Sequence, residues 1–300
     1  MDKLYSSPLH YPGGKRWLFP ILADILPPFK EMVSPFFGGG SIELNFAARG
    51  KYISGYDIDP ALVNFWQYYL QDAEAVENAA KEKMMEYLTD QKLLVSQKRI
   101  EESCEYNPQH RVYKELYFYR AVYYYIFNRL SIYGLTYNTK FVKDYLYDIK
   151  KQDFFYTTPM NTRRVFPPMN RMRLIEYPYL KINIETQDYE KTLTENKHVF
   201  TYCDPPYYNN EHLYTFSTFH EKFHEKLAEI LKARDNWVLS YNDVPFIHEL
   251  YAEFGKKSLE MTSGFRRQGK RKKNTELLIF SDDIYDYILE FQPQQQQLII

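Results

Sequence analysis

The pattern of apolar and polar positions divides the chain into two kinds of region. Near both ends, short β-prone runs alternate with helical patterns, which is typical of an α/β sheet. The middle of the chain instead shows long helical patterns, expected at 62–70, 73–88 and 115–130. The sequence therefore predicts an α/β domain formed by residues 1–60 and 181–290, a mostly helical insert at 61–180, and a low-complexity tail at 291–300.

The β-prone runs predict the strands of the sheet, and the 3.6-residue patterns predict its helices. The expected strands are 32–34, 52–56, 181–184, 199–203, 237–241, 257–262 and 276–280. The expected helices are 17–26, one that begins near 41 and stops at Gly50, one that begins near 217, and 246–251. In the third of these, Thr218 and Glu221 have the spacing of a capping box.

The run at 199–203 ends in Asp204, Pro205, Pro206 and Tyr207. Because proline has no backbone N–H, the chain must leave the sheet at Asp204. Open α/β sheets bind ligands at the carboxyl ends of their strands. A carboxylate, rigid backbone carbonyls and an aromatic face at this edge suit a planar ring that carries an amino group. A plain strand-terminating turn is the alternative.

A glycine-rich turn at 35–41 follows the first expected strand and precedes a helix. Glycines let a ligand approach the backbone, and the helix N-terminus is electropositive. Asp57 closes the next strand, where an acid can accept hydrogen bonds from both ribose hydroxyls, with Asp59 as the alternate. The turn is not the dinucleotide pattern G-x-G-x-x-G, so a nucleoside cofactor with one short tail is the more economical ligand. The earlier segment Pro12-Gly13-Gly14-Lys15 offers backbone amides and a positive charge, or is a simple turn.

Composition limits the choice of partners. The net charge of the 300 residues is −1, which gives no global attraction to polyanions. Any nucleic-acid contact must therefore come from a local patch, and the loop at 265–274 supplies one. Its basic residues are Arg266, Arg267, Lys270, Arg271, Lys272 and Lys273. A solvated hairpin tip is the alternative.

Several other classes of protein fit less well. The two cysteines, Cys104 and Cys203, lack metal-ligand spacing and suggest no disulfide framework. No secretory signal pattern or membrane-spanning run is present, so a cytoplasmic setting without a membrane is expected.

The sequence His220-Glu221-Lys222-Phe223-His224 matches the zinc-protease motif H-E-x-x-H. Capping already explains this helix start, and the third ligand is not obvious, although His248 or Glu249 can be proposed. Phe223 and Leu227 are expected on the buried face, with the two histidines near polar positions. We therefore expect no metal site.

Four segments, 11–15, 35–41, 57–59 and 204–207, occur in an order that resembles the Dam-type (D12 class) DNA adenine-N6 methyltransferases. The likeness extends to 127–129, to His224 and to the basic hairpin before 275–277. It covers most of the chain, thinly between 61 and 180. One departure is Ser34, where many relatives have an acid, which puts the contact to the cofactor's ammonium group in doubt.

The resemblance implies a Rossmann-like S-adenosylmethionine-dependent methyltransferase fold, with duplex DNA as partner and a restriction enzyme as a possible further one. It assigns S-adenosylmethionine to Tyr11, Lys15, Phe37, Gly38, Gly40, Asp57, Ile58 and Asp204. It assigns catalysis to Asp204, Pro205 and Tyr207. The DNA-binding set is Arg129, Arg266, Arg267, Lys270, Arg271, Lys272 and Lys273. The oligomeric state stays open.

The expected reaction begins with an adenine extruded from the duplex. Tyr207 stacks on the base, while the Asp204 carboxylate and the Pro205 carbonyl accept hydrogen bonds from the N6 amine. Methyl transfer is then a direct displacement that depends on positioning. Cytosine N4, RNA adenine or a protein glutamine are alternative acceptors, and a non-catalytic DNA-binding relative is the alternative outside enzymes.

Overall fold

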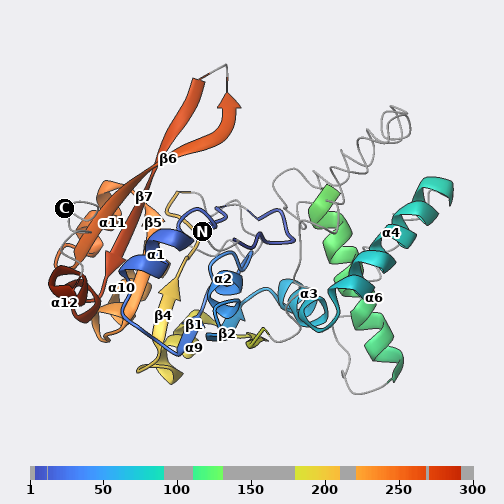
Figure 1. The fold of residues 1–300 in the computed structure, drawn as a ribbon, viewed down its shortest axis with the longest axis horizontal. Coiled ribbons are helices and arrows are strands. Elements are labelled where there is room, and N and C mark those ends of the chain that lie inside the picture. The colour runs from blue at the N-terminus through green and yellow to red at the C-terminus, as the bar shows by residue number, and fades with distance from the viewer. Residues whose placement is uncertain are drawn as a thin grey trace. The chain divides into compact units, whose positions relative to one another are not determined.

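The computed structural model describes residues 4–11, 13–90, 111–130, 180–209, 221–267 and 270–291. Of these, 84–90, 111–116, 127, 130, 261–267 and 270–274 are described by their backbone alone. The chain forms two compact units (Figure 1). Unit 1 comprises Met1–Arg16, Gly38–Ala48 and Asp59–Thr186, and unit 2 comprises Trp17–Phe37, Arg49–Ile58 and Gln187–Ile300.

The strands form a seven-stranded sheet in the order β3-β2-β1-β4-β5-β7-β6. β1 is parallel to both β2 and β4, β4 is parallel to β5, and β7 is antiparallel to β5 and β6. The bounds are β1 Glu31–Ser34, β2 Tyr52–Asp57, β3 Ile182–Thr186, β4 Phe200–Cys203, β5 Trp237–Asn242, β6 Gly255–Arg267 and β7 Lys270–Phe280. This arrangement confirms the expected α/β sheet and places a topological switch point between β1 and β4.

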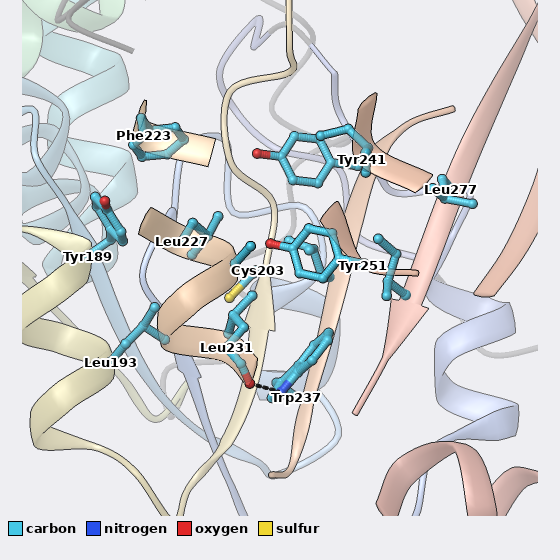
Figure 2. Packing of buried hydrophobic residues seen from close by; sticks show 14 residues of the cluster. Tyr189, Leu193, Cys203, Phe223, Leu227, Leu231, Trp237, Tyr241, Tyr251 and Leu277 are labelled. Carbon is cyan, nitrogen blue, oxygen red and sulfur yellow. Dashed lines mark hydrogen bonds between the residues drawn. The ribbon is translucent and has the colours of Figure 1, made fainter. Parts of the chain in front are cut away.

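Unit 2 buries a continuous apolar core on one face of its sheet. Side chains alternate along a strand, so Trp237, Leu239 and Tyr241 of β5 share this face. They pack with residues from α9 (Tyr189–Glu195), α10 (Glu221–Lys232) and α11 (Pro245–Leu250), as Figure 2 shows. Trp237 Nε1 donates a hydrogen bond to the backbone oxygen of Leu231 at 2.9 Å, which satisfies the buried indole. Unit 2 also contains α1 (Phe19–Ile25) and α12 (Asp282–Phe291).

Unit 1 is mainly helical in its described part. Its elements are α2 Glu43–Ala47, α3 Pro60–Gln71, α4 Ala73–Asp90, α6 Arg111–Leu130 and β3. Asp59 caps α3, because its Oδ1 accepts the N–H groups of Ala61 and Leu62 at 2.8 and 3.3 Å. Phe65 of α3 stacks on Tyr125 of α6, with ring centroids 5.7 Å apart. α6 is thus a central packing helix, as its nearly all-round apolar pattern indicates.

The expected elements occur close to their predicted positions, with two omissions. The helices predicted at 62–70, 73–88 and 115–130 are α3, α4 and α6. The sequence pattern did not reveal α9 or α12, and it made β6 and β7 too short. The role of 61–180 as a recognition domain stays a prediction, and residues 131–179 and 292–300 lie outside the described part of the chain.

Candidate functional site at the carboxyl edge of the sheet

The strand register brings two predicted carboxylates to the same edge of unit 2. Val33 of β1 pairs with Ser54 on one side and with Thr201 on the other, so these two partners stand at one level. Asp57 and Asp204 each follow their partner by three residues, so Asp57 ends β2 and Asp204 directly follows β4, the two strands that flank β1. Two interstrand spacings separate such positions by about 10 Å, a span suited to a nucleoside-sized ligand.

The side chains at this edge differ in exposure. Asp57 is 9% exposed and Asp204 is half-buried, whereas the next residue after β2, Ile58, is 40% exposed. An exposed isoleucine directly after a buried carboxylate gives the edge an apolar surface beside an acceptor. Cys203, just before Asp204, lies instead in the buried core with Leu227 and Leu231 of α10 (Figure 2). The apolar run before Asp204 predicts from the sequence that Cys203 faces the core, and its burial confirms this.

Phe37 closes the chain onto β2 after β1 ends. Its backbone N–H donates to the oxygen of Tyr56 at 2.9 Å, and its side chain is buried. A Cβ atom at Gly55 would lie 2.3 Å from Cδ2 of Phe37. Gly55 therefore leaves the space that the ring occupies, and the ring fixes the start of the glycine turn.

In unit 1, the Tyr11 ring lies directly against the glycines at the end of this turn. A Cβ atom at Gly38 or at Gly39 would come within 2.8 Å of Tyr11. Gly38 also has a φ of +48°, and its oxygen accepts a 2.9 Å hydrogen bond from Trp66 Nε1. These glycines are thus required by the close approach of Tyr11, a reason that the sequence pattern did not reveal.

Two asparagines hold the segment 5–11 by its backbone. Asn45 of α2 accepts from the N–H of Tyr5 and donates to the oxygen of Tyr5, both at 2.9 Å. Asn128 of α6 makes the same pair of bonds to His10, at 2.7 and 2.9 Å. Each side-chain amide therefore replaces a strand partner for one residue. We call these two contacts the asparagine clamps.

The clamps correct one expectation from the sequence. As a polar residue beside Arg129 near the end of an apolar helix, Asn128 is expected from the sequence to face a groove, but it is fully buried and bonded to His10. Its neighbour Arg129 is half-buried and donates to the oxygen of Pro8 at 3.3 Å. Burial lowers the pKa of Arg129. The assignment of Arg129 to DNA stays a prediction.

Lys15 and Gly40 complete the predicted residues of unit 1. The Lys15 side chain is buried, and its Nζ donates to the oxygen of Gly13 at 3.0 Å. Gly13 and Gly40 both have positive φ, of 77° and 63°. The lysine therefore folds back over the tight turn before it, where glycine accommodates the left-handed backbone.

Beyond Asp204, the two tyrosines of the loop are held by different partners. The Tyr207 hydroxyl donates to Oε1 of Glu276 at 2.5 Å, and Ser240 of β5 donates to the same oxygen. The Tyr208 hydroxyl donates to Glu221 at 2.9 Å, and its ring stacks on Phe246 at 4.4 Å. Pro205 and Pro206 are buried between the strand and this loop.

The H-E-x-x-H residues that the structure describes have other partners. Glu221 accepts from Tyr208, and Nδ1 of His224 lies 2.5 Å from the Tyr241 hydroxyl. His224 is fully buried, so the expectation that it lies near polar positions is wrong. Its polar partner Tyr241 comes from β5, which a helical pattern cannot reveal. His220 lies outside the described residues.

The basic hairpin forms a two-stranded ribbon at the same edge of unit 2. β7 pairs with β5 from Glu276 to Phe280, but it pairs with β6 as far as Lys270. Residues 270–275 and their β6 partners therefore extend past the carboxyl end of β5 (Figure 1). The basic side chains of this ribbon lie outside the described ones, and their assignment to DNA stays a prediction.

Within the described residues, no three or more His, Cys, Asp or Glu side chains gather in a metal-binding arrangement. None of the described helices combines the length and the apolar composition that crossing a membrane requires.

Two kinds of residue escaped the sequence reasoning. The asparagine clamps and the acceptor Glu276 act on partners far along the chain, such as Tyr207, which is 69 residues before Glu276. One signal was available for Glu276: it directly precedes the apolar run Leu277 to Phe280, and an acid in a buried strand needs donors.

Comparison with known proteins agrees with the ordered motifs. The family model described as D12 class N6 adenine-specific DNA methyltransferase matches residues 11–265. A search of curated proteins found no match. The family match covers most of the chain and spans the glycine turn, both edge carboxylates and most of β6. The chain therefore belongs to the D12 class of N6 adenine-specific DNA methyltransferases.

Proposed function

We propose that this enzyme transfers a methyl group from S-adenosylmethionine to the N6 amine of an adenine flipped out of duplex DNA. The observation that carries the proposal is the register of β2, β1 and β4, which sets Asp57 and Asp204 at one sheet edge on either side of β1. This edge is the switch point where α/β folds bind nucleotide ligands.

The residues at the edge fit the adenosine part of this cofactor. Asp57 supplies acceptors for ribose hydroxyls, and the exposed Ile58 beside it supplies an apolar surface for a base. Phe37, Gly38, Gly40, Tyr11 and Lys15 are the further residues that we assign to the cofactor, on the strength of the motif order. When bound, S-adenosylmethionine supplies an electrophilic methyl group.

Asp204 orients the amine in this proposal. Its half-buried carboxylate and the Pro205 carbonyl accept hydrogen bonds from the N6 amine, and these bonds discourage conjugation of the nitrogen lone pair with the ring. The lone pair is then available for direct displacement, so the rate depends on preorganised acceptors and positioning. Tyr207 stacks on the extruded base and offsets part of the unstacking cost of a few kcal/mol.

The ribbon of β6 and β7 carries the DNA contact together with Arg129. A two-stranded ribbon fits the major groove, and its basic residues suit phosphates. The residues proposed are Arg266, Arg267, Lys270, Arg271, Lys272 and Lys273. Binding through them releases counterions, so DNA affinity should fall steeply between low and moderate salt. An affinity independent of salt would contradict this interface.

The test of the function is incubation with labelled S-adenosylmethionine and duplex DNA, followed by nucleoside analysis. The expected product is N6-methyladenine, whereas N4-methylcytosine would overturn the base, and label in RNA or protein alone would overturn the substrate. Asp204→Asn should lower kcat by roughly 10²- to 10³-fold, the scale of one lost preorganised partner.

The matched control is Asp283→Asn, which removes an equal charge at the opposite edge of unit 2. There Asp283 accepts the N–H of Asn236, just before β5 begins. This control should keep wild-type kcat. A folded Asp204→Ala enzyme with full activity would contradict the proposed role of Asp204.

A further inference from the structure

Glu276 is a buried acid in β7, and the residues that follow it in this strand, Leu277 to Phe280, are all apolar. It is 1% exposed, and it pairs with Asn242 of β5 and with Leu259 of β6. Burying a carboxyl group among apolar side chains is unfavourable unless hydrogen bonds satisfy it. Its partners therefore indicate what the acid does in this position.

Two of those partners are hydroxyl groups, and one belongs to the motif tyrosine. Tyr207 and Ser240 both donate to Oε1 of Glu276, the first at 2.5 Å. Ser240 lies on the neighbouring strand β5, and its hydrogen bond holds Oε1 of Glu276 in place. Tyr207 comes from the loop after the two buried prolines, 69 residues earlier in the chain. Glu276 thus joins the Asp204 loop to the far strands of the sheet.

The contact holds the Tyr207 ring at both ends. Its backbone is fixed by the prolines before it, and by the Tyr208 carbonyl after it, which accepts from Asn242 Nδ2 at 3.0 Å. Its hydroxyl is fixed by Glu276. The centroid of the Tyr241 ring lies 6.2 Å from the centroid of the Tyr207 ring, with 36° between the ring planes. Rotation about the Cα–Cβ bond of Tyr207 would carry its hydroxyl away from Glu276. The hydroxyl oxygen lies on the axis of the Cβ–Cγ bond, so the hydrogen bond fixes where the ring lies.

We propose that Glu276 is a positioning residue for methyl transfer: it holds the Tyr207 ring at the place where the target adenine stacks. This inference rests on the proposed function. Glu276 acts through Tyr207 and not on the base itself. Because small misplacements of a positioning group can lower the rate strongly, losing this acceptor should reduce kcat.

The first test compares two substitutions at Glu276. Glu276→Leu removes the acceptor and should lower kcat by roughly ten- to a hundredfold. Glu276→Gln keeps an oxygen that can accept both hydroxyls and should restore kcat to near the wild-type value. The Kd for S-adenosylmethionine should be unchanged in both, because the change lies in the orientation of the base and not in the cofactor residues.

The second test removes the donor. Tyr207→Phe keeps the ring but not the hydroxyl, so it should lower kcat to the same degree as Glu276→Leu. The double variant should be no slower than either single variant, since both remove one interaction. This test also serves if Glu276→Leu does not fold.

The matched control is Tyr69→Phe in unit 1. Tyr69 is a buried tyrosine whose hydroxyl donates to Glu77 at 2.8 Å, so its removal disrupts a similar buried pair. It should lower the melting temperature as Tyr207→Phe does, while kcat stays at the wild-type value. A Tyr207→Phe enzyme whose kcat changes no more than that of Tyr69→Phe would overturn the inference.

Other outcomes separate the inference from the proposed function. A folded Glu276→Leu enzyme with wild-type kcat overturns the positioning role alone. A Glu276→Gln enzyme as slow as Glu276→Leu, with the wild-type melting temperature, overturns it in favour of a chemical role for the carboxyl group. A wild-type enzyme that methylates no adenine overturns the proposed function, and the inference with it.

Discussion

Two segments each carry a tyrosine of the candidate site, Tyr11 and Tyr207, and the structure holds these segments in different ways. In unit 1, the segment 5–11 is bound through its backbone by the asparagine clamps, with Tyr11 packed on glycines. In unit 2, the loop after Asp204 is bound through its side chains, with the Tyr207 hydroxyl on Glu276.

The difference concerns what each anchor specifies. An amide that bonds the N–H and the oxygen of one residue fixes the path of the chain, whatever side chain that residue carries. A hydroxyl bonded to a buried acid fixes one ring and depends on that tyrosine. The first arrangement therefore shapes a whole segment, whereas the second places a single ring.

The strongest disruption of the first anchor should come from filling the space under Tyr11. Gly38→Ala adds a Cβ atom 2.8 Å from the ring at a φ of +48°, so overpacking and left-handed strain combine to about 2–4 kcal/mol. Gly39→Ala has the same close approach without that φ, and should cost about 1–3 kcal/mol.

Urea denaturation and calorimetry with S-adenosylmethionine measure both changes. Gly50→Ala is a suitable comparison, because its φ is +82° but no atom lies within 4 Å of the added Cβ. It reports the cost of φ alone. Equal stability of the wild type and Gly39→Ala would show that Tyr11 moves without cost, and the glycines would then need another explanation.

A smaller effect is expected from opening one asparagine clamp. Asn128→Ala removes two hydrogen bonds to the backbone of His10 and should cost about 1–3 kcal/mol. Amide hydrogen exchange in 5–11 should become faster, while exchange in 204–208 stays unchanged. Asn183→Ala, at an exposed asparagine of β3, is the control. Faster exchange in both segments after Asn128→Ala would contradict two separate anchors.

The smallest effect concerns Cys203, next to Asp204 but on the core side of the strand. Burial raises the pKa of its thiol to about 12. At pH 8 only about one thiol in 10⁴ is then ionised, so iodoacetamide should leave Cys203 unmodified in the folded enzyme and modify it in urea. Peptide mass spectrometry measures this. Rapid modification at pH 8 would contradict the burial.

The raised pKa of Cys203 also predicts how the free energy of unfolding changes with pH. Because the folded pKa is raised, the contribution of the neutral thiol is fully present below the ordinary value of 9.0 and is lost as pH rises toward 12. As the pH rises from 9.0 to about 12, the free energy of unfolding of Cys203→Ala should therefore fall less than that of the wild type. Its kcat should remain close to that of the wild type, since the thiol has no part in the transfer.

Much of the fold could be predicted because its signals are local. Alternation and β-branched residues marked each strand near its true position, and proline after Asp204 fixed where β4 ends. The helix α9 escaped because it has seven residues and a polar sequence, with Asp188 as its only clear start signal. α12 follows β7 after a single residue, Ser281, so no loop sequence marks the start of this helix.

The residues of the candidate site likewise differ in whether a local sequence signal reveals them. Asp57 and Asp204 could be singled out because each stands at the carboxyl end of its own β-prone run. The choice between Asp57 and Asp59 as the ribose acceptor required the structure. The structure shows that the Asp59 side chain caps α3. The burial of His224 was mispredicted because its partner Tyr241 lies on another element.

The sequence by itself determined the order of the strands along the chain, the carboxylates at their ends and the membership of the family. These follow from residues that are neighbours in the chain. The tertiary structure alone decided that Tyr207 is held by Glu276, that Tyr11 occupies the space over Gly38, and that Asn128 binds His10. Such contacts depend on strand register and helix packing, because the partners lie tens of residues apart and only folding brings a donor to its acceptor.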